Sequence, residues 1–415
     1  MKILWVCMVK FPPLCEHLGV ETSVYCGWLY SSAKVMIEEY DIELSVAVPT
    51  YTSKFSKHIV AGITYYQVPI NNIADYNKQT IKYCCQVIDD VNPHVIHIHG
   101  TEYSLASAFC IANNKKHRII ANLQGLASVI ARYTDASLTI KDHICNISPL
   151  DFFRGTFMLK EKYIMLRRAQ KEKSILSKLT DVIGRTSWDY AHALTINHEL
   201  KYHFMNETLR DSFYEQPIWE YTKCIKHSIF VSNSNPAYKG AHMVIKALPT
   251  ILRYFPDTHI YFVGQNVLTT KFREKLRFQG YHLYLCRLIK KMGLEKYVTF
   301  YGSLSEVEMK QAFLDAHVYI LPSAIENSPN SLCEAQILGV PVISSFCGGT
   351  PDLVQHGKTG FLYRYEEHEM LSHIVINLFK MQSYEELSRN ERNVALTRHD
   401  KKMNAKRLYD IYCYK

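Results

Sequence analysis

The sequence predicts an α/β protein made of two doubly wound domains in tandem. Short apolar runs alternate with helical stretches in the first half of the chain, and the same alternation begins again in the second half. In addition, 415 residues are too many for one ordinary core. The predicted domains cover residues 1–215 and 216–395, and a last segment covers 396–415.

Strands and helices alternate in the first half. The run KILWVCMV at 2–9 is apolar almost throughout, as expected of a strand that helices cover on both faces. Further strands are expected at 42–49, 94–100 and 117–125, and helices at 27–39, 80–91 and 103–112. Ligands of a parallel sheet bind beyond the carboxyl ends of its strands. In this half those ends carry His99, Gly100, Gln124 and Gly125.

A long basic stretch at 150–180 is expected to be helical. From Arg154 to Lys178 it holds eight Lys or Arg residues and two Glu residues. One interpretation is a solvated helix face, and the other is an interfacial helix near anionic lipid or a lipid-phosphate substrate.

The alternation resumes in the second half. Strands are expected at 227–233, 259–265, 297–302, 317–323 and 341–345, with helices at 241–254, 272–292 and 305–316. The last of these helices opens with Ser305 and Glu308, the spacing of a capping box.

Composition excludes several classes of protein. No apolar run reaches the roughly 18–20 residues that span a bilayer, and the N-terminus resembles a buried strand rather than a signal peptide. The twelve cysteines are scattered without a CxxC pair, which favours reduced thiols in a cytosol over disulfides or a zinc site. The net charge of +9 favours anionic ligands or an anionic membrane surface, and it is weak evidence for nucleic acid.

Two glutamates, Glu326 and Glu334, flank a Ser-Pro-Asn-Ser turn. Ser328 is a suitable N-cap, Pro329 suits the first helical position, and Gly339 would end the helix. The start of such a helix can hold a phosphate. The Glu334 carboxylate can accept two hydrogen bonds from a ribose diol, and Glu326 can meet a hexose hydroxyl. This pattern describes a nucleotide-sugar site, although two solvated glutamates near a helix start are the ordinary alternative.

The stretch from His317 to Tyr363 resembles the donor-site signature of the retaining glycosyltransferases of family 4, which have the GT-B fold. The resemblance rests on Glu326-x7-Glu334, on GVPVI at 339–343, on Gly348-Gly349 with Asp352, and on Gly360-Phe361. It implies two Rossmann-like domains that face each other across a cleft. It also implies that the C-terminal helix, at about 400–413, crosses back to the first domain.

The resemblance also implies roles for individual residues. Glu334 would bind the donor ribose, Glu326 the donor sugar, and Lys239 the diphosphate. A glycine loop near the start of the chain would approach the diphosphate through its N–H groups, with Gly27 as the better candidate and Gly19 as the second. The expected catalytic residues are Glu326, His99 and Gln124, and the expected donor-binding residues are Lys239, Glu334, Asn330, Ser331, Gly27, Gly19 and Arg185.

The chain departs from the family pattern at three positions. Asn233 and Ser234 stand where the family has an arginine. Arg185 is the candidate replacement, unless it only pairs with an acid such as Asp189.

The other two departures concern the sugar. Gln124 replaces the family histidine, so His99 is the remaining histidine candidate, or else a structural buried residue. Asn327 replaces a glycine after Glu326, which restricts the loop there.

The implied reaction moves a sugar from a nucleoside diphosphate to an acceptor hydroxyl with retention, without a cofactor or a metal. The expected acceptor is a saccharide or a lipid-linked oligosaccharide of a bacterial surface polysaccharide. The expected location is the cytoplasm, with peripheral contact to anionic lipid on the inner face of the plasma membrane and no nucleic-acid partner. The alternatives are a GT-B nucleotide-sugar epimerase or hydrolase, and a nucleotide-sugar-binding protein without activity.

Overall fold

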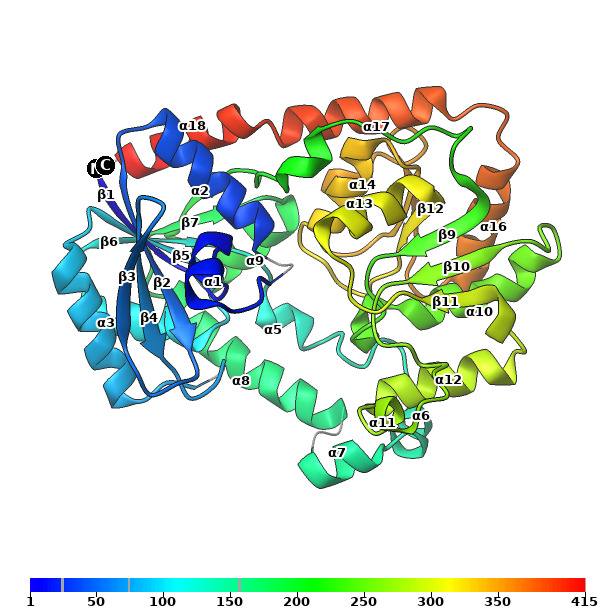
Figure 1. The fold of residues 1–415 in the computed structure, drawn as a ribbon, viewed down its shortest axis with the longest axis horizontal. Coiled ribbons are helices and arrows are strands. Elements are labelled where there is room, and N and C mark those ends of the chain that lie inside the picture. The colour runs from blue at the N-terminus through cyan, green and yellow to red at the C-terminus, as the bar shows by residue number, and fades with distance from the viewer. Residues whose placement is uncertain (24–25, 74, 156–157, 415) are drawn as a thin grey trace. The chain divides into compact units, whose positions relative to one another are not determined.

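The computed structural model describes residues 1–23, 26–73, 75–155 and 158–414. The chain groups into two compact units (Figure 1). The first unit consists of Met1–Val129, Ile164–Asp211 and Arg398–Lys415, and the second of Ile130–Tyr163 and Ser212–Thr397. This grouping differs from the ranges expected from the sequence mainly at 130–163, which lies with the second unit.

The first unit is built on an eight-stranded sheet in the order β3-β4-β2-β1-β5-β6-β7-β8. Its neighbouring strands are parallel except for β3 and β4, which form an antiparallel hairpin at one edge. The strands are β1 (Lys2–Val6), β2 (Glu43–Thr50), β3 (Ser56–Val60), β4 (Ile63–Pro69), β5 (Val95–His99), β6 (Arg118–Asn122), β7 (Asp181–Gly184) and β8 (Lys201–Phe204).

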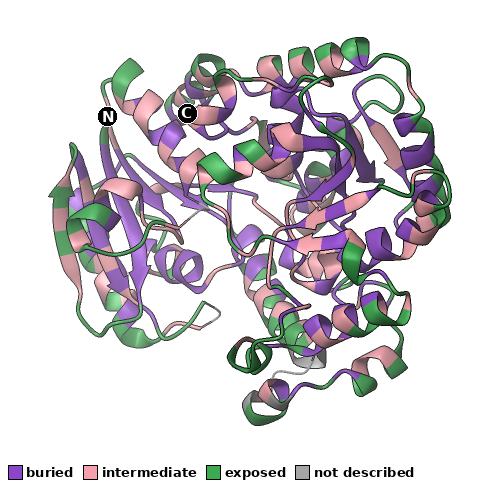
Figure 2. Ribbon diagram, turned by 45° about the vertical axis from the view of Figure 1, so that its right-hand side comes forward, coloured by how far each residue is buried: buried purple, intermediate pink, exposed green. Residues whose placement is uncertain are grey.

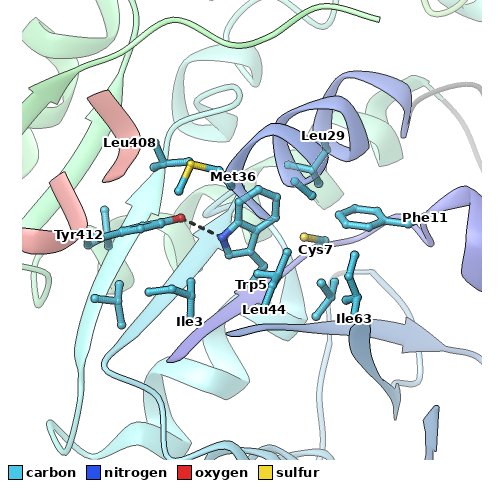
Figure 3. Packing of buried hydrophobic residues seen from close by; sticks show 14 of the residues in the cluster. Ile3, Trp5, Cys7, Phe11, Leu29, Met36, Leu44, Ile63, Leu408 and Tyr412 are labelled. Atoms are coloured by element: carbon cyan, nitrogen blue, oxygen red, sulfur yellow. Dashed lines mark hydrogen bonds between the residues drawn. The ribbon is translucent and has the colours of Figure 1, made fainter. Parts of the chain in front are cut away.

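Helices that are distant in sequence share the core of the first unit. The core joins β1 and β2 to α1, α2 and α18, and α18 lies alongside α2 (Figure 1). The indole Nε1 of Trp5 on β1 donates a buried hydrogen bond of 2.8 Å to the hydroxyl of Tyr412 on α18 (Figure 3). The last helix is therefore part of the first unit. The helices here are α1 (Pro12–Leu18), α2 (Gly27–Glu39), α3 (Lys78–Val91), α4 (Ser104–Asn113), α9 (Ser187–Ile196) and α18 (Lys401–Cys413).

The second unit contains a six-stranded sheet, all parallel, in the order β11-β10-β9-β12-β13-β14. Of its central strands, β12 is buried along its whole length and β9 over its last four residues (Figure 2), because these stretches are largely apolar on both faces. The strands are β9 (Ile225–Val231), β10 (His259–Phe262), β11 (Val298–Phe300), β12 (Ala316–Leu321), β13 (Val342–Ser345) and β14 (Phe361–Tyr363).

The remaining elements complete the second unit and the segments that join the two. They are α5 (Ala127–Ile130), α6 (Ile140–Cys145), α7 (Pro149–Arg154), α8 (Met158–Leu176), η1 (Asp211–Tyr214), η2 (Ala237–Lys239), α10 (Ala241–Leu252), α11 (Phe272–Lys275), α12 (Gly280–Lys291), η3 (Glu295–Tyr297), α13 (Glu306–Asp315), α14 (Asn330–Leu338), α15 (Thr350–Leu353), α16 (His368–Phe379) and α17 (Glu385–Arg398).

The predicted fold class is confirmed: each unit is a Rossmann-like α/β layer structure on a parallel sheet. The capping box at Ser305 and Glu308 is also present. Two expected helices are divided. The stretch at 272–292 forms α11 and α12, and the basic stretch at 150–180 forms α7 and α8, with residues 156–157 outside the described residues. No helix among the described residues is long and apolar enough to cross a membrane.

Candidate functional site

Five of the predicted site residues gather in the second unit. Lys239 ends η2, which follows β9, while Glu326 lies on the loop between β12 and α14. Asn330 and Ser331 begin α14, and Glu334 is buried one turn further on. Strands β9 and β12 are parallel neighbours, so these residues lie together beyond the carboxyl ends of the strands. We refer to these five residues as the donor cluster.

Two glycines allow the loops of the donor cluster to approach each other. Gly240 has φ 75°, and a Cβ there would lie 1.8 Å from the carbonyl oxygen of Pro322. Gly348 has φ 52°, and a Cβ there would lie 1.8 Å from the carbonyl oxygen of Glu326. The next N–H, at Gly349, donates a 3.0 Å hydrogen bond to that same oxygen. The Gly-Gly turn therefore supports the backbone of Glu326.

An ion pair lies at the centre of the donor cluster. The Nζ atom of Lys239 donates to Oε1 of Glu326 at 2.6 Å, and the hydroxyl of Ser323 donates to the same oxygen at 2.7 Å. The exposed fractions of the two charged side chains are 22% and 11%. Burial lowers the pKa of Lys239, but the Glu326 carboxylate more than offsets this effect, so the net pKa lies above its ordinary value. The lysine is therefore a cation that already has a counter-ion.

The start of α14 differs by one residue from the sequence prediction. Pro329 is the N-cap rather than the first helical residue, because its ψ of 118° is extended, and Ser328 is not the cap. No side chain caps this end, which leaves the first N–H groups without that partner. Ser331 is positioned by the hydroxyl of Tyr319 on β12, which donates to its Oγ at 2.9 Å. Gly339 ends the helix in the left-handed conformation, as predicted.

His99 lies in the first unit at the end of β5 and is almost fully buried. Its ring stands 4.6 Å from that of Trp5 and 4.0 Å from that of His97, and both of its nitrogens lack a hydrogen-bond partner among the described residues. Burial, and secondly His97, hold the pKa of His99 well below its usual range. The imidazole is therefore neutral. It lines a cavity of about 10 Å³, enough for about one water molecule, together with Asn122 and Glu207.

Gln124 and Arg185 both contact Glu207, a residue that the sequence pattern did not reveal. The Nε2 atom of Gln124 donates to Oε1 of Glu207 at 2.7 Å. The guanidinium of Arg185 forms a buried ion pair with Glu207 at 2.5 Å and donates to the carbonyl oxygens of Leu123 and Gln124. Arg185 thus pairs with Glu207, and Asp189 instead accepts from its backbone N–H at 3.0 Å. Its expected role in donor binding stays a prediction, and its contacts favour a positioning role.

The two glycine candidates occupy different positions. Gly27 is the first residue of α2, and its N-cap residue Cys26 makes no side-chain capping bond. Gly19 is the C-cap of α1 with φ 64°, which explains the glycine by backbone conformation. The backbone role expected of Gly27 therefore stays a prediction, whereas Gly19 has a structural reason of its own.

Two further residues, Glu102 and Tyr319, lie in or just after the strands that carry the predicted site residues. Glu102 is buried three residues after β5, and burial raises its pKa to about 7. The rule that selected His99 and Gly100 could have found it. Tyr319 lies inside an apolar strand, where a buried tyrosine hydroxyl requires a partner. Glu207 offers no comparable signal, because it lies on an irregular segment.

Residues 226–394 match the family model of the glycosyl transferases group 1. The chain is 28% identical over 127 residues to sulfoquinovosyl transferase SQD2 of Arabidopsis thaliana, covering 30% of this chain and 22% of that protein. It is 34% identical over 91 residues to the putative colanic acid biosynthesis glycosyltransferase WcaL of Salmonella typhimurium, covering 20% and 22%. These matches span less than a third of either relative.

The fold of the whole chain is similar to that of solved structures. One is WaaG, a glycosyltransferase involved in lipopolysaccharide biosynthesis, with a TM-score of 0.65 at 13% identity and 99% of both chains covered. Anabaena Alr3699/HepE in complex with UDP and glucose has a TM-score of 0.70 at 16% identity, with 100% of both chains covered. The chain therefore has the GT-B fold, and the part that carries the donor cluster is similar to the glycosyl transferases group 1.

Proposed function

We propose that the protein is a retaining glycosyltransferase of the family 4 type, which moves a sugar from a nucleoside diphosphate to an acceptor hydroxyl. The donor cluster carries this proposal. A lysine, an uncapped helix start and two carboxylates lie at one edge of a parallel sheet. The match of residues 226–394 to the glycosyl transferases group 1 supports the same reaction class.

Each part of the donor has a partner in this proposal. Lys239 and the N–H groups of Asn330 and Ser331 hold the diphosphate. Glu334 accepts hydrogen bonds from the ribose diol, and Glu326 accepts them from sugar hydroxyls. A uridine nucleotide is a reasonable first candidate, since the similar Anabaena protein was solved with UDP and glucose.

The proposed chemistry takes place on one face of the sugar. The bond from the anomeric carbon to the diphosphate oxygen breaks, and a bond from that carbon to the acceptor oxygen forms. The acceptor proton passes to the leaving phosphate. The protein contributes mainly by stabilising the negative charge that develops on the diphosphate. Lys239 and the start of α14 supply this stabilisation, so turnover should persist in excess EDTA.

In the first unit, Gln124 and Gly27 are the proposed contacts to the substrates. The amide of Gln124 is held by Glu207, which in turn is held by Arg185, so Arg185 positions Gln124 without touching the substrate. His99 is neutral and can take part in hydrogen bonding but not as a cation.

The proposed acceptor is a saccharide or lipid-linked oligosaccharide of a surface polysaccharide. The similarity to a putative colanic acid biosynthesis glycosyltransferase supports this class. The proposed location is the cytoplasm, at the inner face of the plasma membrane.

An apolar patch in the second unit supports peripheral contact with a membrane. Phe152 and Phe153 on α7 are 70% and 85% exposed, and Ile140 and Ile144 on α6 are also exposed. Lys141 lies beside them in the sequence. Exposed aromatic and aliphatic side chains near a lysine suit the interface of an anionic bilayer.

The cations of α8 contribute less to this contact than the sequence pattern implied. Lys162 pairs with Asp135 at 2.6 Å, and Arg167 pairs with Asp75 at 3.2 Å. Replacing Phe152 and Phe153 with serine should therefore reduce co-sedimentation with anionic vesicles more than removing the charge of Lys162. Equal co-sedimentation of the double serine variant and the wild type would exclude a membrane contact through these side chains.

The first test is thermal unfolding with UDP, GDP, ADP, CMP and dTDP at matched concentrations. A ligand at about 100 times its dissociation constant adds about 2.7 kcal/mol of stability, so one nucleotide should raise the melting temperature by a few degrees. The matching nucleotide sugar is then incubated with and without acceptors. Free sugar or an isomer without acceptor would indicate the hydrolase or epimerase. Binding without turnover on any acceptor would indicate the binding protein.

A further inference from the structure

A second pocket lies in the first unit, away from the strand ends described above. It has a volume of about 550 Å³ and lies between α4, the C-terminal part of α8 and the beginning of β6. Arg118 and Ile119 at the start of β6 line it, whereas Gln124 follows the opposite end of the same strand. Its volume falls in the range of pockets that bind small molecules. The proposed transferase reaction gives this pocket no role.

One wall of the pocket is apolar. Ile111 on α4 faces it together with Ile175 and Leu179 from the region of α8. Ile111 is half exposed even though it is a large aliphatic residue. An alkyl group in this space would remove that surface from water, which is favourable.

The rim of the pocket carries two cations without counter-ions. Lys115 and Lys178 both line the pocket and are exposed. The ammonium group of neither side chain makes a hydrogen bond or an ion pair within the described ranges. By contrast, Lys171 and Arg118 at the same pocket pair with Asp75 and Asp181. The pocket therefore has a net positive rim that can receive one anionic group.

A buried hydroxyl in the pocket also lacks a partner. Ser107 on α4 is 5% exposed, and its Oγ makes no hydrogen bond to any described residue. The Nε2 atom of His117, another lining residue, is buried without a partner as well. An unmade hydrogen bond at a buried polar atom is unfavourable, and a polar ligand atom would satisfy it.

We propose that this pocket binds an amphiphile with a single anionic head, of the class of alkyl phosphate monoesters. The head lies between Lys115 and Lys178, and the alkyl chain lies along Ile111 and Leu179. This site is separate from the donor cluster, so its test does not depend on the proposed transferase activity.

Isothermal titration calorimetry of the full chain with octyl phosphate tests the proposal. The wild type should bind about one equivalent. The double variant Lys115→Gln/Lys178→Gln should bind about tenfold more weakly, since two charge-assisted contacts at a solvated rim are lost. Ile111→Glu should also weaken binding, because it places a charged carboxylate against the alkyl chain. Neither change affects a buried packing position.

A matched control is available in the same segments. Lys116→Gln/Lys173→Gln removes two charges within five residues of Lys115 and Lys178, at positions that do not line the pocket. Its affinity should equal that of the wild type. Equal losses in both double variants would overturn the proposal, because binding would then depend only on net charge. Absence of binding to the wild type, or equally tight binding of inorganic phosphate or of octyl glucoside, would also overturn it.

Discussion

Substitution of Glu326 by glutamine should tighten the binding of a bare nucleoside diphosphate while it lowers turnover. In the free protein, Lys239 already donates to Oε1 of Glu326 at 2.6 Å. An incoming diphosphate must share this lysine with a carboxylate of the same sign as itself. Glutamine keeps the shape and removes that charge, so the cation is free to hold the phosphate.

The size of the effect follows from the burial of the pair. An exposed ion pair contributes about 0.2–1 kcal/mol, whereas loss of one partner from a buried pair costs about 3–5 kcal/mol. Exposed fractions of 22% and 11% place this pair between those cases. We therefore expect a gain of about 1–2 kcal/mol in binding, which is about 5- to 30-fold in Kd. The ligand-free variant should be less stable than the wild type, because Lys239 loses its counter-ion.

Calorimetry with the nucleotide selected by thermal unfolding measures this difference. Glu220→Gln is the control, because Glu220 forms an exposed ion pair with Lys223 just before β9 begins. This pair lies on the side of the amino ends of the strands, opposite the donor cluster. The control should leave Kd unchanged. A weaker or unchanged Kd in Glu326→Gln would refute the idea that the two groups compete for Lys239. Unchanged turnover with the nucleotide sugar would refute the contact between Glu326 and the sugar.

Three other substitutions probe different parts of the molecule. Glu334→Ala should weaken both nucleotide binding and turnover, because the proposed ribose contact would already form in the ground state, and unchanged Kd for the nucleotide would contradict that role. Gly348→Ala should lower thermal stability and turnover, since its Cβ would meet the carbonyl oxygen of Glu326, and wild-type values in both assays would count against this packing. Glu102 has a raised pKa of about 7, so its contribution to stability is present below pH 4.5 and is lost as the pH rises to 7. Between pH 5 and 7, the free energy of unfolding measured with denaturant should therefore fall by about 2–3 kcal/mol less in Glu102→Gln than in the wild type. Parallel curves of this free energy against pH would contradict the raised pKa.

The fold was predictable from sequence because its signals are local. Buried parallel strands such as β1 and β12 are short and largely apolar runs, and the same alternation with helices repeats along the chain. The hairpin of β3 and β4 was not predicted. Strand β3 alternates between intermediate and exposed residues and contains Lys57 and His58, so it lacks the apolar pattern of the other strands. Ala61 and Gly62 form its turn with positive φ, and only the glycine marks such a turn in a sequence.

Most of the donor cluster could be predicted from the sequence, because most of it lies within one stretch of chain. Glu326, Asn330, Ser331 and Glu334 fall within nine residues, and only Lys239 comes from another loop. The contacts around Gln124 could not be predicted from the sequence in this way. Glu207 is 83 residues away, and neither its type nor its neighbours distinguish it from a surface glutamate. Sequence patterns identify groups that one helix or turn brings together, whereas contacts between distant loops require the fold.

The proposed donor site lacks the arginine of the family pattern that this chain resembles, so it would depend more on the pair of Lys239 and Glu326. Asn233 and Ser234 occupy that place, and Ser234 is engaged with the carbonyl oxygen of Val263 at 3.0 Å. Among the described residues of the donor cluster, Lys239 is the one side-chain cation, and in the free protein its charge is balanced by Glu326. If sugar hydroxyls draw the Glu326 carboxylate away, the same event releases Lys239 toward the diphosphate. A nucleotide sugar would then gain more from the cluster than a bare nucleotide. This coupling would give a physical reason for joining the carboxylate proposed to bind the sugar to the lysine proposed to bind the phosphate.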